Sequence, residues 1–333
     1  MKRIGGLYDD IWNWDNLRMA FYRARRGARR SQEALAFERN LDLELSTLQA
    51  ELRQHRVLLG SFRQFVIHDP KERTIKAPSF RDRVLHHALM GVCEPHFERW
   101  LISDTFACRR GKGRLAALQR ATSLAKRYPW FLKLDVRRYF DSISHDCLAD
   151  ALERKFKDRN LLRLFQQIIR AHESMPGRGL PIGSLVSQHL ANFYLGPLDR
   201  RVKEDLSIPG FVRYMDDFVL WDEKGGSLKG AWSDIEGFLE THLRLALKPG
   251  THMNRTLHGM DFCGFRIFPG WRTLNRRSRK RLRMRLGELD RLWISGAEPE
   301  SALQARAQSI LAFAREGNSW QSRRRALSRV STA

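Results

Sequence analysis

The stretch from Phe211 to Trp221 constrains this chain more than any other part of its sequence. It reads FVRYMDDFVLW, so two runs rich in Val, Phe, Tyr and Leu flank the adjacent carboxylates Asp216 and Asp217. Such runs favour strands, and so short a connection predicts a hairpin with both aspartates at its turn. Two neighbouring negative charges are unfavourable unless a cation or a proton compensates them. An exposed Asp-Asp turn is the plain alternative, which a third carboxylate elsewhere in the chain would argue against.

Asp135 supplies that third carboxylate at the end of another apolar run. The sequence WFLKLDV from Trp130 to Val136 predicts a mostly buried strand. A carboxylate there is costly unless it is paired or binds a metal. If this strand neighbours the hairpin in one antiparallel sheet, the three carboxylates converge. Two divalent ions held in this way serve in-line phosphoryl transfer, and oxygen ligands suit Mg²⁺.

The charge of the chain indicates a polyanionic partner. Its 333 residues include 60 Lys and Arg against 37 Asp and Glu, a formal charge of +23. This excess favours nucleic acid. A membrane surface is the weaker alternative, because no lipidation motif or amphipathic anchor accompanies the charge. No apolar signal core or membrane-length run is present in the sequence, so we expect a soluble, cytoplasmic protein.

Basic residues gather in a few segments. Solvated helix faces are the alternative for such runs, but clusters without interspersed acids favour phosphate contact. The residues that we expect to contact nucleic acid are Arg25, Arg26, Arg29, Arg30, Arg109, Arg110, Lys112, Arg276, Arg277, Arg279 and Lys280. A hairpin predicted from residues 62–68 and 73–78 carries Lys71 and Arg73, which would share one face and clamp a triphosphate.

The sequence Tyr214-Met215-Asp216-Asp217 resembles the signature of reverse transcriptases, and the order of motifs matches that family over roughly residues 15–270. Asp135 followed by Phe140 resembles the family's first catalytic motif, and the loop from Phe106 to Gly113 is similar to its second conserved block. In the first motif the aspartate binds metal, the next carbonyl assists, and the aromatic residue excludes a ribose 2′-OH.

The resemblance implies a set of functional residues. The catalytic and metal-binding residues are Asp135, Asp216 and Asp217, with Val136 as a further metal contact. The dNTP-binding residues are Arg73, Lys71, Phe140, Ile182, Gly183, Gln188 and Lys248, and the primer grip consists of Phe262, Cys263 and Gly264. Two Mg²⁺ ions are the implied cofactors, with Mn²⁺ as a possible substitute.

The implied fold class is α+β, a right-hand polymerase. An N-terminal extension and helical and hairpin fingers would occupy residues 1–128. An antiparallel-sheet palm would follow over 129–270, with a fingers or helical insertion at about 147–180. A small helical thumb would occupy 271–333, and its first helix would have an apolar stripe of Leu282, Leu286, Leu289 and Trp293.

One departure from the common pattern narrows the resemblance. Most relatives have Gln-Gly-x-x-x-Ser-Pro before the motif B helix, where this chain has Ile182 to Gln188, reading IGSLVSQ. This form resembles the reverse transcriptases of diversity-generating retroelements, with Ile182 in place of Gln and Gln188 in place of Pro. Replacing an amide by Ile182 removes a hydrogen bond that could report base-pair geometry. Neutral packing drift is the alternative.

The narrower resemblance implies error-prone cDNA synthesis from a template-repeat RNA, with misincorporation at adenines, for mutagenic retrohoming. Its implied partners are that RNA, the cDNA or primer strand, dNTPs and a small, helical, oligomeric accessory variability protein, in a bacterial, archaeal or phage setting. A retron or group II intron-like enzyme of ordinary fidelity is the alternative within the class. A catalytically inactive, polymerase-like RNA-binding protein is the alternative outside it.

Overall fold

The computed structural model describes residues 3–29, 31–68, 72–250 and 252–327. The chain divides into two compact units, each built from separate stretches of sequence. The first unit comprises Met1–Ser103, Val136–Arg201 and Asp234–Pro249, and the second comprises Asp104–Asp135, Val202–Ser233 and Gly250–Ala333. The predicted functional boundaries at residues 128 and 270 stay a prediction.

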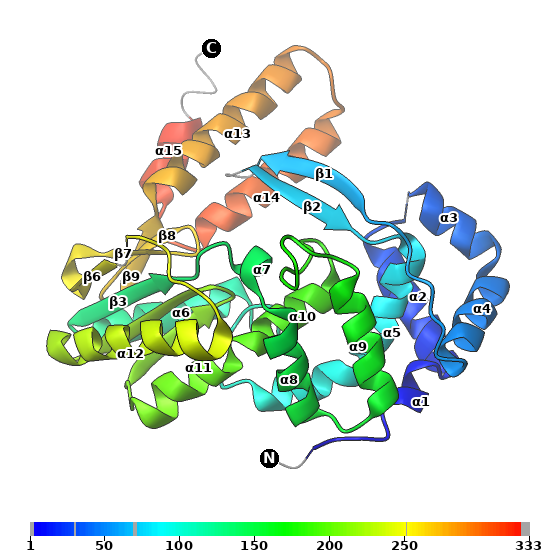
Figure 1. Cartoon of the computed structure of the whole chain (residues 1–333). Coiled ribbons are helices and arrows are strands. Elements are labelled where there is room, and N and C mark those ends of the chain that lie inside the picture. The colour runs from blue at the N-terminus through cyan, green and yellow to red at the C-terminus, as the bar shows by residue number, and fades with distance from the viewer. Residues whose placement is uncertain (1–2, 30, 69–71, 251, 328–333) are drawn as a thin grey trace. The chain divides into compact units, whose positions relative to one another are not determined.

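The first unit is mainly helical. Helices α2 (Trp14–Arg26) and α5 (Phe80–Trp100) pack side by side (Figure 1). The rings of Phe21, Phe37 and Phe80 lie within 6.2 Å of one another between centroids, so aromatic packing joins α2 and α5 to α3. Other helices of this unit are α1 (Tyr8–Ile11), α3 (Gln32–Arg39), α4 (Leu41–Arg53), α7 (Tyr139–Ser142), α8 (His145–Lys155), α9 (Arg159–Arg170), α10 (Leu185–Tyr194) and α11 (Gly196–Arg200).

The predicted N-terminal hairpin is present in this unit. Strand β1 (Arg63–His68) pairs antiparallel with β2 (Glu72–Ala77), with Arg63 opposite Ala77 and His68 opposite Glu72. Every residue of β1 is exposed, so the hairpin depends on its connections rather than on a core of its own.

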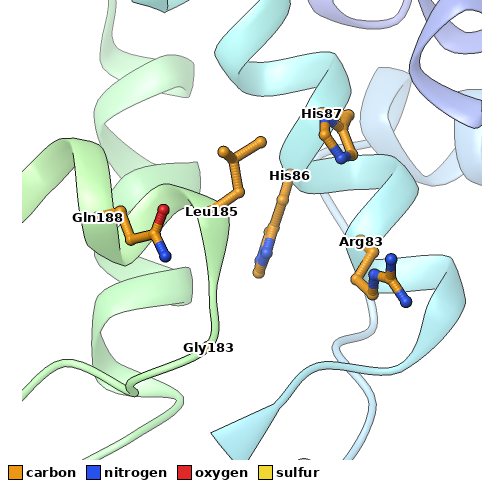
Figure 2. A pocket seen from close by; sticks show the side chains of 6 residues that line it. All are labelled: Arg83, His86, His87, Gly183, Leu185 and Gln188. Atoms are coloured by element: carbon orange, nitrogen blue, oxygen red, sulfur yellow. The ribbon is translucent and has the colours of Figure 1, made fainter. Parts of the chain in front are cut away.

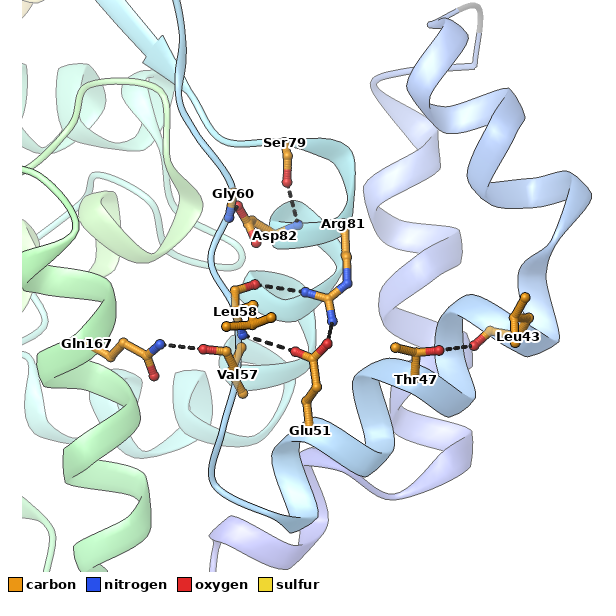
Figure 3. Close-up of polar contacts among 10 residues, drawn as sticks. All are labelled: Leu43, Thr47, Glu51, Val57, Leu58, Gly60, Ser79, Arg81, Asp82 and Gln167. Carbon is orange, nitrogen blue, oxygen red and sulfur yellow. Dashed lines mark hydrogen bonds and ion pairs between the residues drawn. The ribbon is translucent and has the colours of Figure 1, made fainter.

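Polar contacts fix the segment that leads into β1 (Figure 3). The Arg81 guanidinium donates to the Leu58 carbonyl over 2.9 Å and forms an ion pair with Glu51 over 2.6 Å. The Gly60 N–H donates to Asp82 Oδ2 over 2.9 Å, and burial raises the pKa of that carboxyl group. Helices α4 and α5 therefore hold the approach to the hairpin.

The second unit contains a four-stranded antiparallel sheet in the order β4-β5-β3-β6. Its strands are β3 (Trp130–Asp135), β4 (Gly210–Tyr214), β5 (Asp217–Asp222) and β6 (His252–Arg255). Helix α6 (Arg114–Arg127) packs on β4 and buries Ala117, Leu118 and Ala121 in the same core as Phe131 and Val219. The predicted hairpin and its neighbouring Asp135 strand are thus both present. Strand β6, a short and polar segment, was not predicted.

The rest of this unit follows the sheet in sequence. Strands β7 (Met260–Phe262), β8 (Phe265–Phe268) and β9 (Trp271–Leu274) form a three-stranded antiparallel sheet. Helices α13 (Arg276–Ile294), α14 (Glu300–Arg315) and α15 (Trp320–Leu327) come next. In the predicted apolar stripe of α13, Leu282, Leu286 and Leu289 are buried, whereas Trp293 is 56% exposed. Near the end of the helix it is the partly buried Leu292 that packs against the core.

Helix α12 (Gly225–Leu243) contributes residues to both units. The four cysteines are free thiols. Within the described ranges, no helix is both long enough and apolar enough to cross a membrane.

Gly196 opens α11 directly against the indole of Trp100. A Cβ atom on Gly196 would lie 1.8 Å from Cζ3 of that ring. The indole cannot easily withdraw, because it also contacts Phe193 at 4.6 Å between ring centroids, and the Trp100 carbonyl accepts a hydrogen bond from Arg200 over 2.7 Å. A close approach of this kind requires glycine.

We therefore expect Gly196→Ala to lower the free energy of unfolding by about 2 kcal/mol or more through overpacking. Gly230→Ala in α12 is the matched control, because nothing lies within 4 Å of its added Cβ. There the gain in helix propensity should stabilise the chain by roughly 0.5–1 kcal/mol. Urea denaturation of both variants checks this, and equal effects would contradict it.

Candidate active site

Two of the predicted catalytic carboxylates face each other across neighbouring strands. Asp135 is the last residue of β3 and Asp217 the first of β5, and the register pairs them directly. Directly opposed residues in an antiparallel pair have their Cβ atoms about 4.5–5.5 Å apart and lie on the same face. The fold therefore brings together residues that lie far apart in the sequence.

The third carboxylate lies in the turn between β4 and β5. Tyr214 pairs with Asp217, which leaves Met215 and Asp216 as a two-residue loop. Met215 adopts a left-handed backbone with φ +60°, a conformation that costs roughly 1–2 kcal/mol for a residue other than glycine. The fully buried Arg213 supports it, because its Nη1 donates to the Met215 carbonyl over 2.9 Å.

Asp217 has an unusual environment for a carboxylate. Its side chain is 26% exposed, but Oδ1 is buried and has no hydrogen-bond partner among the described residues, whereas Oδ2 accepts from Lys133 Nζ over 2.9 Å. Burial raises the pKa of Asp217 to about 6, the Lys133 ammonium opposes that rise, and the charges of Asp135 and Asp216 add to it. The three carboxylates therefore repel one another.

These residues fit a hard divalent cation. The donors are carboxylate oxygens, which Mg²⁺ and Mn²⁺ prefer, and one of them, Oδ1 of Asp217, is buried without a hydrogen-bond partner in the described part of the chain. Within the described residues, no three His, Cys, Asp or Glu side chains are arranged around one point as a ligand set. The strand register brings Asp135 opposite Asp217, and Asp216 precedes Asp217 in the turn. The convergence of all three carboxylates on one point stays a prediction.

The predicted primer grip is a tight hairpin turn. Phe262 of β7 pairs with Phe265 of β8, which leaves Cys263 and Gly264 between them. Both have positive φ angles, 47° and 89°, and this combination suits the right-handed twist of a hairpin. Burial raises the pKa of the Cys263 thiol. The Lys133 ammonium also donates to the Asp261 carbonyl over 2.7 Å, so it contacts both this hairpin and Asp217.

Predicted dNTP-binding residues lie in the first unit. Arg73 is exposed on β2, Phe140 is partly buried in α7, and Lys248 is exposed after the Val136–Leu247 bridge. The Lys76 N–H of β2 donates to the Ile182 carbonyl over 2.8 Å. Gly183 has φ +119°, and a Cβ on it would lie 2.8 Å from Ile75 Cγ2. The β1–β2 hairpin and the Ile182–Gly183 loop are therefore in direct contact. Lys71, predicted here, lies outside the described residues.

Gln188 lines a small polar pocket (Figure 2). The pocket has a volume of about 210 Å³ and is bordered by Arg83, His86 and His87 of α5 and by Gly183, Leu185 and Gln188. Burial lowers the pKa of His86 to about 3 and of His87 to about 4, so both imidazoles are neutral. His86 Nδ1 lies 3.3 Å from Ser184 Oγ. These contacts pack the start of α10 against α5.

The basic residues predicted to contact nucleic acid differ in their exposure and in the partners that they already have within the chain. Arg26 and Arg29 line an open pocket of about 440 Å³ together with Arg63 and Arg83. Arg25 is instead paired with Glu38 over 2.8 Å. The Lys112 ammonium lies 5.1 Å from the Phe106 ring centroid, and Arg109 donates to the Thr105 carbonyl over 3.0 Å. Residues exposed on the first turns of α13 are Arg276, Arg277, Arg279 and Lys280, and exposed Arg110 lies in the loop before α6. Arg30 lies outside the described residues.

The sequence reasoning did not single out Lys133 and Arg213, which both contact the carboxylate region. Each is a basic residue inside an otherwise apolar strand. A charge at such a position is costly unless it is paired. This cost, which singled out Asp135, applies equally to Lys133 and Arg213 and would have identified both.

Comparison with known proteins gives consistent matches. The family model for reverse transcriptase (RNA-dependent DNA polymerase) matches residues 68–260, more than half of the chain. Protein YkfC of Escherichia coli is 26% identical over 258 residues, which cover 63% of this chain and 65% of that protein. The group II intron-encoded protein LtrA of Lactococcus lactis is 30% identical over 145 residues, which cover 40% of this chain and 23% of that protein. The matched stretches cover less than two thirds of both relatives.

The fold has solved counterparts as well. The structure of telomerase from Candida albicans, in complex with a fragment of telomeric RNA, superposes with a TM-score of 0.50 at 11% identity. The likeness covers 70% of this chain and 51% of that one. It confirms the predicted fold class, an α+β right-hand polymerase.

Proposed function

This chain belongs to the reverse transcriptase family of RNA-dependent DNA polymerases, and on that basis we propose that it synthesises DNA on an RNA template. The observation that carries the proposal is the pairing of Asp135 with Asp217 on the central strands of the antiparallel sheet, with Asp216 in the adjoining turn. Carboxylates gathered in this way can hold the two metal ions that serve in-line phosphoryl transfer.

Asp135, Asp216 and Asp217 would hold two Mg²⁺ ions, or Mn²⁺ in their place, with the Val136 carbonyl as a further contact. Bound there, the ions supply charge stabilisation for the attacking and leaving oxygens. The chain's own residues do the rest. Strand register fixes Asp135 opposite Asp217, and Arg213 holds the turn that carries Asp216.

Other residues of the chain bind and select the substrate in this proposal. Arg73, with Lys71, clamps the triphosphate through charge-assisted hydrogen bonds, and Lys248 adds a further cation. Phe140 occupies the space that the 2′-OH of an incoming ribonucleotide would need, and so excludes ribonucleotides. The Phe262-Cys263-Gly264 turn grips the primer strand, whose backbone a tight two-residue turn can approach closely.

The narrower proposal is a diversity-generating retroelement enzyme, which makes adenine-directed errors on a template-repeat RNA and works with a small accessory variability protein. Ile182 and Gln188 support it. Ile182 offers no amide to an incoming base, and its backbone is tied to β2 by the Lys76 hydrogen bond. A site without a hydrogen bond that senses pairing geometry discriminates less between bases.

Replacing both Asp216 and Asp217 by Ala removes ligands of both ions. We expect Mg²⁺-dependent primer extension on an RNA template to fall by about a thousandfold or more, while RNA binding survives. Asp222→Ala, at the other end of β5, is the control and should retain activity. Undiminished extension by the double variant would overturn the proposal.

Replacing Phe140 by Ala opens room for a 2′-OH. We expect the ratio of kcat/KM for dNTP over rNTP to fall by about ten- to a hundredfold, since it depends on steric exclusion alone. Primer extension with each nucleotide class measures this ratio. Phe140→Tyr keeps the aromatic ring and should retain the selectivity, and an unchanged ratio in Phe140→Ala would assign sugar selection elsewhere.

Restoring an amide by Ile182→Gln should lower misincorporation opposite template adenines several-fold, because a hydrogen-bonding group again tests the base pair. Ile182→Leu keeps an apolar side chain and should leave the error rate high. Sequencing of cDNA from all three forms provides the measurement. Ordinary fidelity in the unaltered chain would instead favour a retron or group II intron-like enzyme.

A further inference from the structure

Lys133 places an ammonium group at the candidate metal site. It lies two residues before Asp135 on β3, so both side chains share one face of the strand. Its Nζ contacts Asp217 Oδ2 over 2.9 Å and the Asp261 carbonyl over 2.7 Å, and lies 5.7 Å from the Phe262 ring centroid. Its side chain is 22% exposed. One cation therefore joins three strands of this unit, β3, β5 and β7.

Packing of the sheet alone does not require a charged side chain at position 133. The adjacent Leu132 and Leu134 point to the opposite face and fill the core, where both are buried. The Lys133 face carries the buried Phe131 on one side of the lysine and Asp135, with its partner Asp217, on the other. Without a cation these carboxylates repel one another, and the ammonium compensates part of that repulsion.

Lys133 engages only one oxygen of Asp217. Oδ2 accepts the hydrogen bond, while Oδ1 is buried and has no partner among the described residues. The rotation of the carboxylate is thereby set by Lys133, because a second anchor fixes the ammonium itself to the Asp261 carbonyl. The remaining oxygen, Oδ1, is the buried acceptor of this carboxylate that no described donor satisfies.

We propose that Lys133 is a positioning residue that holds Asp217 through Oδ2, presents Oδ1 to the metal, and lowers metal affinity through its own charge. This inference rests on the proposed role of the aspartates as metal ligands. A positive charge within a few ångströms of a divalent ion repels it strongly in a partly buried site. Lys133 thus weakens metal binding, but it fixes the orientation of the Asp217 carboxylate before the ion binds.

Lys133→Met removes the charge and keeps the apolar stem. We expect Mn²⁺ to bind about 5- to 50-fold more tightly because the repulsion is lost, while kcat falls by about 10- to 100-fold because Asp217 is no longer held. The KM for dNTP should change little. Lys133→Arg keeps the charge and a donor, so it should retain the original Mn²⁺ affinity and recover much of kcat.

Opposite changes in metal affinity and turnover separate positioning from a purely structural role. Damage to the sheet would weaken metal binding and turnover together. The full chain, free of nucleic acid and nucleotide, is titrated with Mn²⁺, and unbound Mn²⁺ is followed by electron paramagnetic resonance. Lys229→Met, an exposed lysine of α12, is the matched control and should match the unaltered chain in both measurements.

The double variant Asp216→Ala, Asp217→Ala separates this inference from the proposed function. If it binds Mn²⁺ as the unaltered chain does, the metal assignment is wrong and the role of Lys133 falls with it. If it loses Mn²⁺ but Lys133→Met binds no more tightly than before, only the role of Lys133 is overturned. Should Lys133→Met not fold, Lys133→Gln removes the same charge, and the same tightening is required of it.

Discussion

The register between β3 and β5 is the constraint on which the candidate site depends. Side chains alternate between faces along a strand, so a slip of one residue would turn Asp135 away from Asp217. The core prevents that slip, because Phe131 opposite Trp221 and Leu132 opposite Leu220 are fully buried. The site is therefore positioned by hydrophobic packing at the far end of the same strands. Burial of the apolar side chains outweighs the repulsion between the carboxylates.

The sheet also contains the cations that make this cluster of carboxylates tolerable. Arg213 lies fully buried and supports the left-handed Met215, while Lys133 reaches Asp217 along the face that carries Asp135. Buried charges stabilise little by themselves, but they restrict the arrangements that are available to their partners. In this sheet they limit where the turn and one carboxylate can lie.

The sequence was sufficient wherever a strong local pattern was present. Apolar runs around Asp135 and the Asp216–Asp217 pair predicted the strands and the hairpin, and both are present. It was insufficient for β6, because His252–Arg255 is polar and short, and becomes a strand only by pairing with β3. Between α8 and α9, Asp158 caps the start of α9 by accepting from the Leu161 N–H. Bond partners such as that of Lys133 depend on the register, which sequence patterns alone do not determine.

The contact between β2 and the Ile182–Gly183 loop has a mechanical consequence. The Lys76 N–H is bonded to the Ile182 carbonyl, and Gly183 lies so close to Ile75 that even a methyl group would not fit. Two segments joined so closely cannot move independently. A displacement of the exposed hairpin is therefore transmitted directly to the loop. In the proposed function, the hairpin that would hold the phosphates of a nucleotide and the loop that would lie beside its base would therefore move together.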